Sequence, residues 1–574
     1  MNIRYHVTVA DPRTHVFEVD LELTREQAGP VRLCLPTWTP GSYLIREYAR
    51  HLDDVMVELD GHMRPAAKVD KATWAVGDGQ TVHARYTVWA HELTVRTSHL
   101  DETHGYINGA TVFLYPEGST SVGGQVSFRL PEGWGVFSAL GAVSADTLAF
   151  SSIDELFDSP IELGLPRVET VSAGDRLHQL VLCGAGPVDL PALAADLPPL
   201  VEAARAVFQR PLPYDRYVFL IHQTGRAGGG LEHRASTSIQ VPRFAASKPK
   251  SRRRLLGLVA HEYFHLWNVK RIHPDALGPF NYQQEAYTRH LWLMEGGTDY
   301  YALLLLGRAN LVPAMDLLQD LAIHMHRSEE RPGNLHQSLE EASFDAWIKY
   351  YRPDAHSPNA TVSYYEKGLL AAWLLDVELR RTSNGRRDLD AFLRDLWDRY
   401  PQGFPEGAPR ALAVDLGGPA LGRFYDDTVA SRAHLDWSPL SYLGLRYEVG
   451  LEEAGPDTGL TVGGEGPGLD VQSVRAGSPG EAAGVAPGDR VIAVDGFQVD
   501  PGQWEERLAW FSPGTAVTLQ LFRDRQLLER SLVLAEPRPN RPRLVPHPEA
   551  GPLERAAFAA WMGQPWPFAV TETR

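Results

Sequence analysis

The sequence is poor in the residues that mark disulfide-stabilised and membrane proteins. Its 574 residues include only two cysteines, Cys34 and Cys183, too few for a disulfide framework and in no metal-ligand spacing. We expect two buried thiols. No run approaches the roughly 18 to 20 uninterrupted apolar residues of a membrane span. The first residues alternate apolar and polar, without the apolar core of a signal peptide, so we expect a cytoplasmic protein with no membrane partner.

Positive charge is also scarce. The chain has 55 Lys and Arg residues against 72 Asp and Glu residues, which gives a net charge of -17. Such a surface repels phosphate backbones and anionic lipids, so we expect no nucleic-acid partner. The overall composition, with 44% hydrophobic and 22% charged residues, is typical of a folded soluble protein. The length exceeds what one hydrophobic core organises and predicts several domains.

Hydrophobic periodicity divides the chain into domains. Residues 1–165 alternate with period two between Pro and Gly turns, which predicts an N-terminal antiparallel β-sandwich. Residues 166–450 begin with strands and then, beyond residue 252, show helical periodicity, which predicts a mixed domain with a small β-sheet and a helical subdomain. A Gly, Pro and acidic stretch marks a boundary near residue 450. Residues 537–574 form a C-terminal tail in which we expect a short helix.

Residues 455–536 resemble a PDZ domain. The stretch "VQSVRAGSPGEAAGVAPGDRVIAVDGFQV" gives a strand, a Ser-Pro helix start, a Gly-Asp turn, a strand and an Asp-Gly hairpin in that order. PDZ domains bind an extended peptide or a chain terminus along a strand edge. We therefore expect a multidomain α+β protein whose C-terminal module presents a substrate, docks a partner or braces the domain before it.

Two histidines and a glutamate interrupt the apolar run "LVAHEYFHLW". On a helix, His261 and His265 lie on one face, one turn apart, so both imidazoles can bind one ion. Glu262 lies about 100° around from His261, where it can act as general base on a zinc-activated water. The alternative is a pair of hydrogen-bonded histidines beside a surface glutamate. We favour the metal, because a glutamate buried in this apolar run without a partner is costly.

Catalytic zinc usually takes three protein ligands and leaves one position for water. Glu295, in the segment "LWLMEGGTDYY" of a second predicted apolar helix, is the candidate third ligand. Asp299, one turn later, competes with it but suits a supporting hydrogen bond better. The sequence thus predicts one Zn²⁺ per chain, held by His261, His265 and Glu295, although another divalent ion would also accept two imidazoles and a carboxylate.

The segments "HEYFHLWNVKR" and "WLMEGGTDYY" resemble the glycyl aminopeptidase family and, more distantly, the aminopeptidase N group. "LPTWTPGSYLIREYARHL" (35–52) and "THGYINGATVF" (103–113) resemble the same family. The resemblance implies a gluzincin metallopeptidase in which a β-rich domain precedes a thermolysin-like zinc peptidase catalytic domain and a PDZ domain. One departure is Gly297, which stands where a bulkier apolar residue is expected and leaves the shape of the substrate pocket open.

The resemblance also implies roles for two further segments. In "GGGLEHRAST" (228–237), an edge strand would pair with the substrate, Gly229 and Gly230 would allow close backbone approach, and Glu232 would bind the free α-amino group. The alternative is a glycine loop with a surface glutamate. In "VSYYEKGLLAAWLLD", Tyr365 would stabilise the oxyanion, and its neighbour Tyr364 would serve in packing.

These features together predict a zinc-dependent aminopeptidase that hydrolyses the N-terminal peptide bond of peptides with a free N-terminus. Glu262 would take a proton from water and pass it to the leaving amine. Family analogy favours a small first residue, Gly or Ala. Two alternatives stay open: a thermolysin-like endopeptidase, which needs no amino group, and a non-catalytic scaffold whose working part is the PDZ-like domain.

Overall fold

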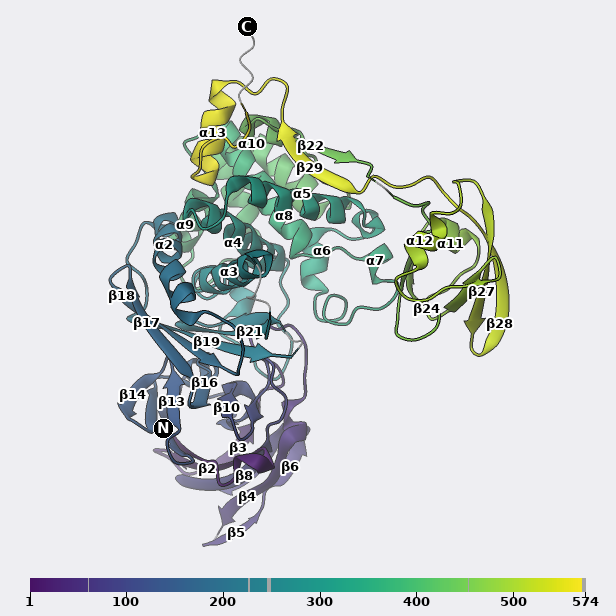
Figure 1. The fold of residues 1–574 in the computed structure, drawn as a ribbon. Coiled ribbons are helices and arrows are strands. Elements are labelled where there is room, and N and C mark those ends of the chain that lie inside the picture. Colours follow the sequence, from purple (N-terminus) through teal and green to yellow (C-terminus); the bar gives the residue numbers. More distant parts are fainter. Residues whose placement is uncertain (60, 226–227, 245–248, 453, 570–574) are drawn as a thin grey trace. The chain divides into compact units, whose positions relative to one another are not determined.

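The computed structural model describes residues 1–59, 61–225, 228–244, 249–452 and 454–569 (Figure 1). These residues form two compact units, each assembled from separate stretches of the chain. The first unit comprises Met1–Thr288, Tyr301–Val312 and Leu393–Glu406, and the second comprises Arg289–Tyr300, Pro313–Phe392 and the chain from Gly407 onward.

The N-terminal part of the first unit consists of β-strands. They are β1 (Asn2–Thr8), β2 (Val16–Thr24), β3 (Pro30–Cys34), β4 (Leu52–Leu59), β5 (His62–Pro65), β6 (Ala67–Asp70), β7 (Thr73–Asp78), β8 (Thr81–Trp89), β9 (His99–Leu100), β10 (His104–Ile107), β11 (Tyr115–Pro116), β12 (Gly124–Arg129), β13 (Gly135–Ser138), β14 (Gly141–Ser144), β15 (Thr147–Phe150) and β16 (Ile161–Gly164). Every second residue of β1 and β8 is buried, as their period-two sequences predict.

These strands form one eight-stranded sheet, in the order β14-β15-β12-β1-β2-β8-β4-β5, and two four-stranded sheets, β13-β16-β10-β9 and β11-β3-β7-β6. One hydrophobic core joins the three sheets. The predicted β-rich domain is therefore confirmed, with one difference. Strands β1 and β12 pair in parallel, because they are far apart in the chain and no hairpin forces them to run antiparallel.

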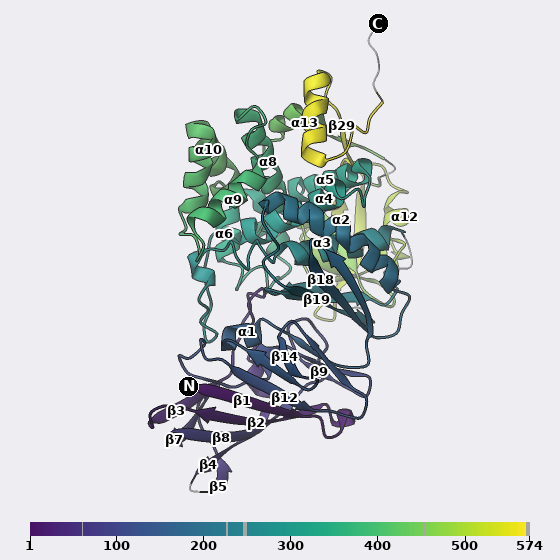
Figure 2. The same ribbon diagram turned by 90° about the vertical axis from the view of Figure 1, so that its left-hand side faces the viewer.

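A five-stranded sheet follows, in the order β17-β18-β19-β21-β20. Its strands are β17 (Arg167–Ala173), β18 (Arg176–Cys183), β19 (Arg216–Thr224), β20 (Gly229–Glu232) and β21 (Ser236–Pro242). The three central strands run parallel, and β20 forms an antiparallel edge. Helix α2 (Leu190–Phe208) connects β18 to β19 (Figure 2), and α3 (Pro249–Phe264) packs on β20 and β21. The edge strand and α3 therefore lie next to each other.

The second unit is organised around helix α8 (Glu366–Thr382), whose residues Lys367 to Arg380 are all buried. Such a helix belongs in a protein interior. A π-helical turn, Trp292–Gly296, crosses α8 so closely that a Cβ on Gly296 would lie 2.5 Å from the backbone of Gly368. Two glycines thus set the distance between the two segments.

Further helices lie between residue 297 and the C-terminus. They are α4 (Gly297–Arg308), α5 (Ala314–Glu329), α6 (Leu339–Phe344), α7 (Ser357–Ala360), α9 (Leu389–Arg399), α10 (Ala408–Tyr425) and α13 (Pro552–Met562). The boundaries of the two units fall inside two of them, α4 and α9. The short helix expected near the C-terminus is α13, and its Trp561 stacks on Trp373 of α8 with ring centroids 5.6 Å apart. Strands β22 (Leu445–Gly450) and β29 (Arg541–Pro546) pair with each other in the second unit.

The predicted PDZ-like module has its own sheet and core. Its elements are β23 (Leu460–Gly463), β24 (Leu469–Val474), α11 (Pro479–Ala482), β25 (Arg490–Val494), β26 (Phe497–Gln498), α12 (Trp504–Leu508), β27 (Ala516–Arg523) and β28 (Gln526–Val533). As the sequence predicts, Ser478 caps α11 with Pro479 at its first turn, and the Asp-Gly pair at 495–496 joins β25 to β26.

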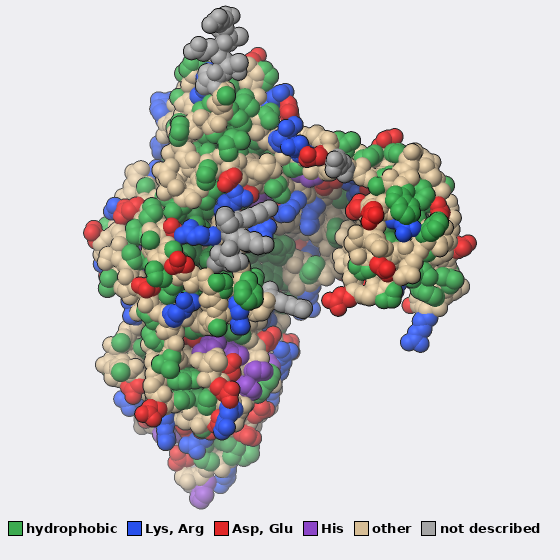
Figure 3. All heavy atoms as spheres, in the orientation of Figure 1, with side chains coloured by type: hydrophobic (Ala, Val, Ile, Leu, Met, Phe, Trp, Pro, Cys, Tyr) green, Lys and Arg blue, Asp and Glu red, His purple; other side chains and the backbone are tan. Residues whose placement is uncertain are grey.

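The multidomain α+β fold is thus confirmed. Cys34 and Cys183 are both free and buried, as expected. Among the helices that the structure describes, none has the length and apolar character needed to cross a lipid bilayer. Acidic and basic side chains are interspersed on the face of the molecule shown in Figure 3.

Replacing Gly296 with alanine should destabilise the protein, because the new methyl group would overlap the backbone of α8. Overpacking of this kind costs about 1–3 kcal/mol, which should appear as a lower midpoint of thermal unfolding. The matched control is Gly257→Ala in α3, where the added methyl meets nothing within 4 Å and should stabilise by about 0.4–1 kcal/mol. Unfolding of Gly296→Ala at the wild-type temperature would contradict the close crossing.

Candidate active site

The two predicted metal-binding histidines lie at the C-terminal end of α3. The helix ends at Phe264, but helical hydrogen bonding continues one residue further, because the His265 N–H donates to the His261 carbonyl at 3.2 Å. The Nε2 atoms of the two imidazoles are 2.9 Å apart. Nδ1 of His265 lies 2.7 Å from the carbonyl oxygen of Asn268. Because a carbonyl can only accept, Nδ1 carries the proton and Nε2 is left with its lone pair.

This pair of nitrogens fits zinc. Two nitrogens at about 2.0–2.1 Å from one tetrahedral zinc lie about 3.3 Å apart, within a few tenths of an ångström of the observed separation. Imidazole nitrogens and carboxylate oxygens are the donors of catalytic zinc sites. The carbonyl of Asn268 supplies the outer hydrogen bond that orients a zinc-binding histidine.

Two glutamates of the first unit lie beside the histidines. Glu262 is 4% exposed and lies against β20, where a Cβ on Gly230 would be 2.0 Å from its Oε1. One ligand-type atom each of Glu232, Glu262 and His265 lies within 4.8 Å of the others. The structure therefore brings the candidate general base and the glutamate of the edge strand to the same place.

Glu232, the last residue of β20, is a buried carboxylate, only 4% exposed. Its Oε1 accepts no hydrogen bond from any residue within the described ranges. A loop of the N-terminal domain covers it: Gly41, at a φ of +88°, stands so close that a Cβ there would be 2.5 Å from Oε1. A surface glutamate is therefore excluded at this position, and a buried carboxylate needs a positive partner.

The two glycines before it differ in their surroundings. Gly229 has a φ of +131°, which other residues rarely adopt. At position 230 any side chain would collide with the carboxylate of Glu262. The group that closely approaches the backbone of Gly230 is therefore a protein side chain. Sequence reasoning missed Gly41, whose only signal was its place in the family-like segment 35–52.

Glu295 and Tyr365 lie in the second unit. Glu295, 2% exposed, belongs to the π-helical turn, which is closed by a hydrogen bond from the Gly297 N–H to the Trp292 carbonyl. The sequence predicted an ordinary α-helix here. A π-turn inserts one residue, re-aims the side chains on it, and is frequent at functional sites. Gly297, the unexpected glycine of the sequence, is thus the residue that ends this turn.

Tyr365 directly precedes α8 and shares an environment with Glu295. Burial, and then the negative charge of Glu295, raise the pKa of Tyr365 well above its usual value. The phenol therefore keeps its proton at neutral pH and can donate a hydrogen bond. Tyr364 is fully buried, with its ring 4.8 Å from that of Tyr365, a position that suits packing. Asp299, in the first turn of α4, is half-buried.

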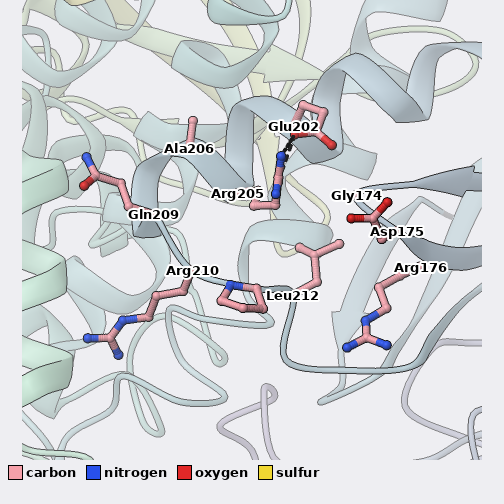
Figure 4. Close-up of a pocket in the computed structure, with 10 residues that line it drawn as sticks. Gly174, Asp175, Arg176, Glu202, Arg205, Ala206, Gln209, Arg210 and Leu212 are labelled. Carbon is pink, nitrogen blue, oxygen red and sulfur yellow. Dashed lines mark hydrogen bonds and ion pairs between the residues drawn. The ribbon is translucent and has the colours of Figure 1, made fainter.

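A surface hollow near the C-terminal end of α2 is a weaker candidate (Figure 4). Its charged side chains pair with carboxylates: Arg205 with Glu202 at 2.6 Å, Arg176 with Asp215 at 3.0 Å, and Arg210 with Asp398. Because each of these arginines already has an acidic partner, the hollow lacks the charge that would attract an anionic ligand.

Comparison with known proteins identifies the families that parts of the chain match. The model of the peptidase M61 N-terminal domain matches residues 4–165, and that of the M61 glycyl aminopeptidases matches residues 254–371. The resemblance to the glycyl aminopeptidase family is confirmed. A PDZ domain model matches residues 456–534. The chain accordingly contains a region that matches the M61 glycyl aminopeptidases, with a PDZ domain after it. No curated protein matches its sequence.

Solved structures extend the comparison. The chain is similar to the crystal structure of an aminopeptidase N family protein from Idiomarina loihiensis, with 29% identity and a TM-score of 0.92 over 98% of this chain and 100% of that chain. An M1 zinc metallopeptidase from Deinococcus radiodurans has 15% identity and a TM-score of 0.49, over 76% and 95% of the two chains. Yeast LTA4 hydrolase has 13% identity and a TM-score of 0.47, over 77% and 70%.

Replacing Gly230 with alanine should impair peptidase activity without unfolding the protein, because the methyl group would displace the Glu262 carboxylate. If Glu262 is the general base, its displacement removes part of that base's roughly 10²–10⁴-fold contribution, so we expect kcat to fall at least tenfold while the metal content stays unchanged. Gly228→Ala is the matched control, since its nearest neighbour would lie at an ordinary 3.7 Å. Equal kcat values for the two variants would show that Glu262 does not depend on this contact.

Proposed function

We propose that the aminopeptidase removes the first residue from peptides with a free N-terminus. The observation that carries this proposal is the buried carboxylate of Glu232, whose Oε1 accepts no hydrogen bond from the described part of the chain. A substrate ammonium would supply the missing charge in a charge-assisted hydrogen bond. Since Glu232 lies within 4.8 Å of both Glu262 and His265 by one ligand-type atom each, a bound amino group would place the adjacent peptide bond near the catalytic groups.

In this proposal His261, His265 and Glu295 hold one zinc ion. Zinc in such a site supplies Lewis acidity, which polarises the scissile carbonyl and makes a water molecule acidic at neutral pH. The hydrogen bond between His265 Nδ1 and the Asn268 carbonyl keeps His265 in the tautomer that offers Nε2. Two imidazoles and one carboxylate leave a position for water, as catalytic sites require.

Glu262 is the proposed general base. It takes a proton from the attacking water and returns it to the leaving amine. Its carboxylate is held against the backbone of Gly230 and is nearly excluded from solvent. Exclusion of bulk water strengthens its electrostatic interaction with the substrate.

Tyr365 is the proposed hydrogen-bond donor to the substrate carbonyl. As water attacks, negative charge develops on that oxygen, and a phenol that stays protonated donates to it more strongly than in the ground state. The raised pKa of Tyr365 supports this role, because burial and the charge of Glu295 keep the O–H intact.

We further propose a preference for Gly or Ala as the first residue. The matching family is described as glycyl aminopeptidases. The loop around Gly41 supports the same preference, because its backbone fills one side of the space around the Glu232 carboxylate. The PDZ domain is proposed to bind an extended peptide or a chain terminus. An endopeptidase would have no use for the buried Glu232, and a non-catalytic scaffold would have no use for Glu262.

Replacing Glu262 with glutamine should lower kcat by about 10²–10⁴-fold, because an amide cannot accept the proton. Substrate KM and zinc content should stay within about twofold of wild type, since the amide has the same shape. Glu202→Gln is the control, because this glutamate pairs with Arg205 on the surface of α2. Full peptidase activity in Glu262→Gln would rule out the mechanism.

A panel of tripeptides with Gly, Ala, Leu or Phe first, each with a free or an acetylated N-terminus, tests the substrate. We expect cleavage of the free peptides only, fastest with Gly and Ala, and loss of all cleavage after treatment with a chelator. Glu232→Gln should raise KM for free peptides by tenfold or more, because a neutral amide loses the ion pair with the ammonium. Equal cleavage rates for acetylated and free peptides would contradict the aminopeptidase assignment and favour an endopeptidase.

A further inference from the structure

A second set of metal-binding side chains meets in the interior of the first unit, and none of its members belongs to the proposed catalytic site. His104, Glu162, Cys183 and His222 each bring one ligand-type atom to a group in which all such atoms lie within 4.8 Å of one another. All four are buried, and Glu162 is not exposed at all. Burial of this many polar groups requires that they satisfy one another or bind an ion.

The fold brings the four together from two sheets that face each other. His104 and Glu162 lie on the paired strands β10 and β16, where Tyr106, two residues after His104, is the partner of Glu162. Cys183 and His222 are direct partners at the ends of the parallel strands β18 and β19. Side chains alternate along a strand, so His104 lies on the same face of its sheet as Tyr106. For the same reason Cys183 lies on the same face as Val181, and His222 on the same face as Leu220. Figure 1 shows β10 and β16 next to the sheet that contains β18 and β19, and Tyr106, Val181, Val218 and Leu220 from these two sheets form one hydrophobic cluster.

The donor atoms converge on Glu162. Nδ1 of His104 lies 2.7 Å from Oε1, Nε2 of His222 lies 2.8 Å from Oε2, and Sγ of Cys183 lies 2.9 Å from Oε1. The last distance is short for sulfur, which is a large atom and a weak hydrogen-bond donor. Comparable crowding, 2.9 Å between two imidazole nitrogens, occurs at the proposed catalytic site.

The chemistry of these donors points to zinc. A thiolate, a carboxylate and two imidazoles are all zinc ligands, and their number is that of a closed tetrahedral site without an open position for water. The charges also balance, because one thiolate and one carboxylate neutralise a divalent cation in a place that solvent does not reach. We propose that these four side chains hold a structural zinc ion, distinct from the catalytic one.

Neighbouring histidines provide an outer layer. His104 also belongs to a group with His99 and Asp101, and Nε2 of His99 lies 3.1 Å from Oδ2 of Asp101. Such outer carboxylate and imidazole groups orient metal ligands. The rings of His91, His99, His104 and His222 follow one another at centroid distances of 5.6, 5.1 and 5.4 Å. His91 is exposed, so the row leads from the surface to the site.

The proposed structural ion would link the N-terminal β-rich domain to the five-stranded sheet that follows it. Its ligands come in equal number from a sheet of the N-terminal β-rich domain and from the five-stranded sheet. That N-terminal domain also supplies Gly41, which lies against Glu232. A metal at this junction would therefore stabilise the position of the loop that covers the proposed amine-binding residue.

Metal content of the full-length protein gives the first test. We expect mass spectrometry to find two zinc ions per chain in the wild-type protein and one in the His261→Ala/His265→Ala double variant. Cys183→Ser should also lose one ion, while Cys34→Ser, which changes the other buried cysteine, should keep both. Retention of one zinc in the double variant would support the structural site. A double variant that binds no zinc would overturn it.

Substitution with cobalt(II) separates the two sites spectroscopically. Only the proposed structural site contains sulfur, so the cobalt protein should show near-ultraviolet thiolate-to-metal charge-transfer absorption that Cys34→Ser retains and Cys183→Ser loses. If Cys183→Ser does not fold, the presence or absence of this absorption in the wild-type cobalt protein decides whether a thiolate binds the metal. Cobalt bound without that absorption would leave only a hydrogen-bonded His-Glu-His cluster and overturn the proposal, whereas failure of the catalytic assignment would leave the absorption intact.

Discussion

The burial of negative charge is the constraint on which the rest of this structure depends. Glu162, Glu232, Glu262 and Glu295 are each 4% exposed or less, and an isolated buried carboxylate costs far more than a folded protein can tolerate. Each therefore defines a place where positive charge must be supplied, by histidines, a metal ion or a substrate ammonium. The proposed chemistry follows from three of these places, because Glu232, Glu262 and Glu295 are the carboxylates assigned to the substrate amine, to proton transfer and to the catalytic metal.

Glycine backbone contacts position the carboxylates. Gly230 allows Glu262 to lie against the edge strand, Gly41 allows the N-terminal loop to close on Glu232, and Gly296 allows the turn that carries Glu295 to cross α8. A backbone held in a sheet or helix moves less than a side chain does, so such contacts restrict a carboxylate more tightly than another side chain would. The proposed site thus owes its order to residues that have no functional group.

Much of the fold could be predicted from periodicity and short motifs. Period-two alternation identified the β-rich N-terminal domain, and turn and capping residues identified the PDZ domain. The four-residue spacing of His261 and His265 correctly predicted one helical turn between them, because the helical hydrogen bond from the His265 N–H to the His261 carbonyl forms although α3 ends at Phe264. The parallel pairing of β1 with β12 and the π-turn at Trp292–Gly296 were missed. Both depend on contacts between segments distant in the sequence, about which local patterns carry no information.

The compact units are interleaved along the chain, and this affects how the protein can be made. The first unit includes Leu393–Glu406, which lie more than a hundred residues after Thr288. During synthesis at about 5–20 residues per second, the N-terminal sheets leave the ribosome long before those last pieces of their own unit are available. The β-rich domain can condense early, whereas the first unit as a whole is complete only after Leu393–Glu406 have been synthesised.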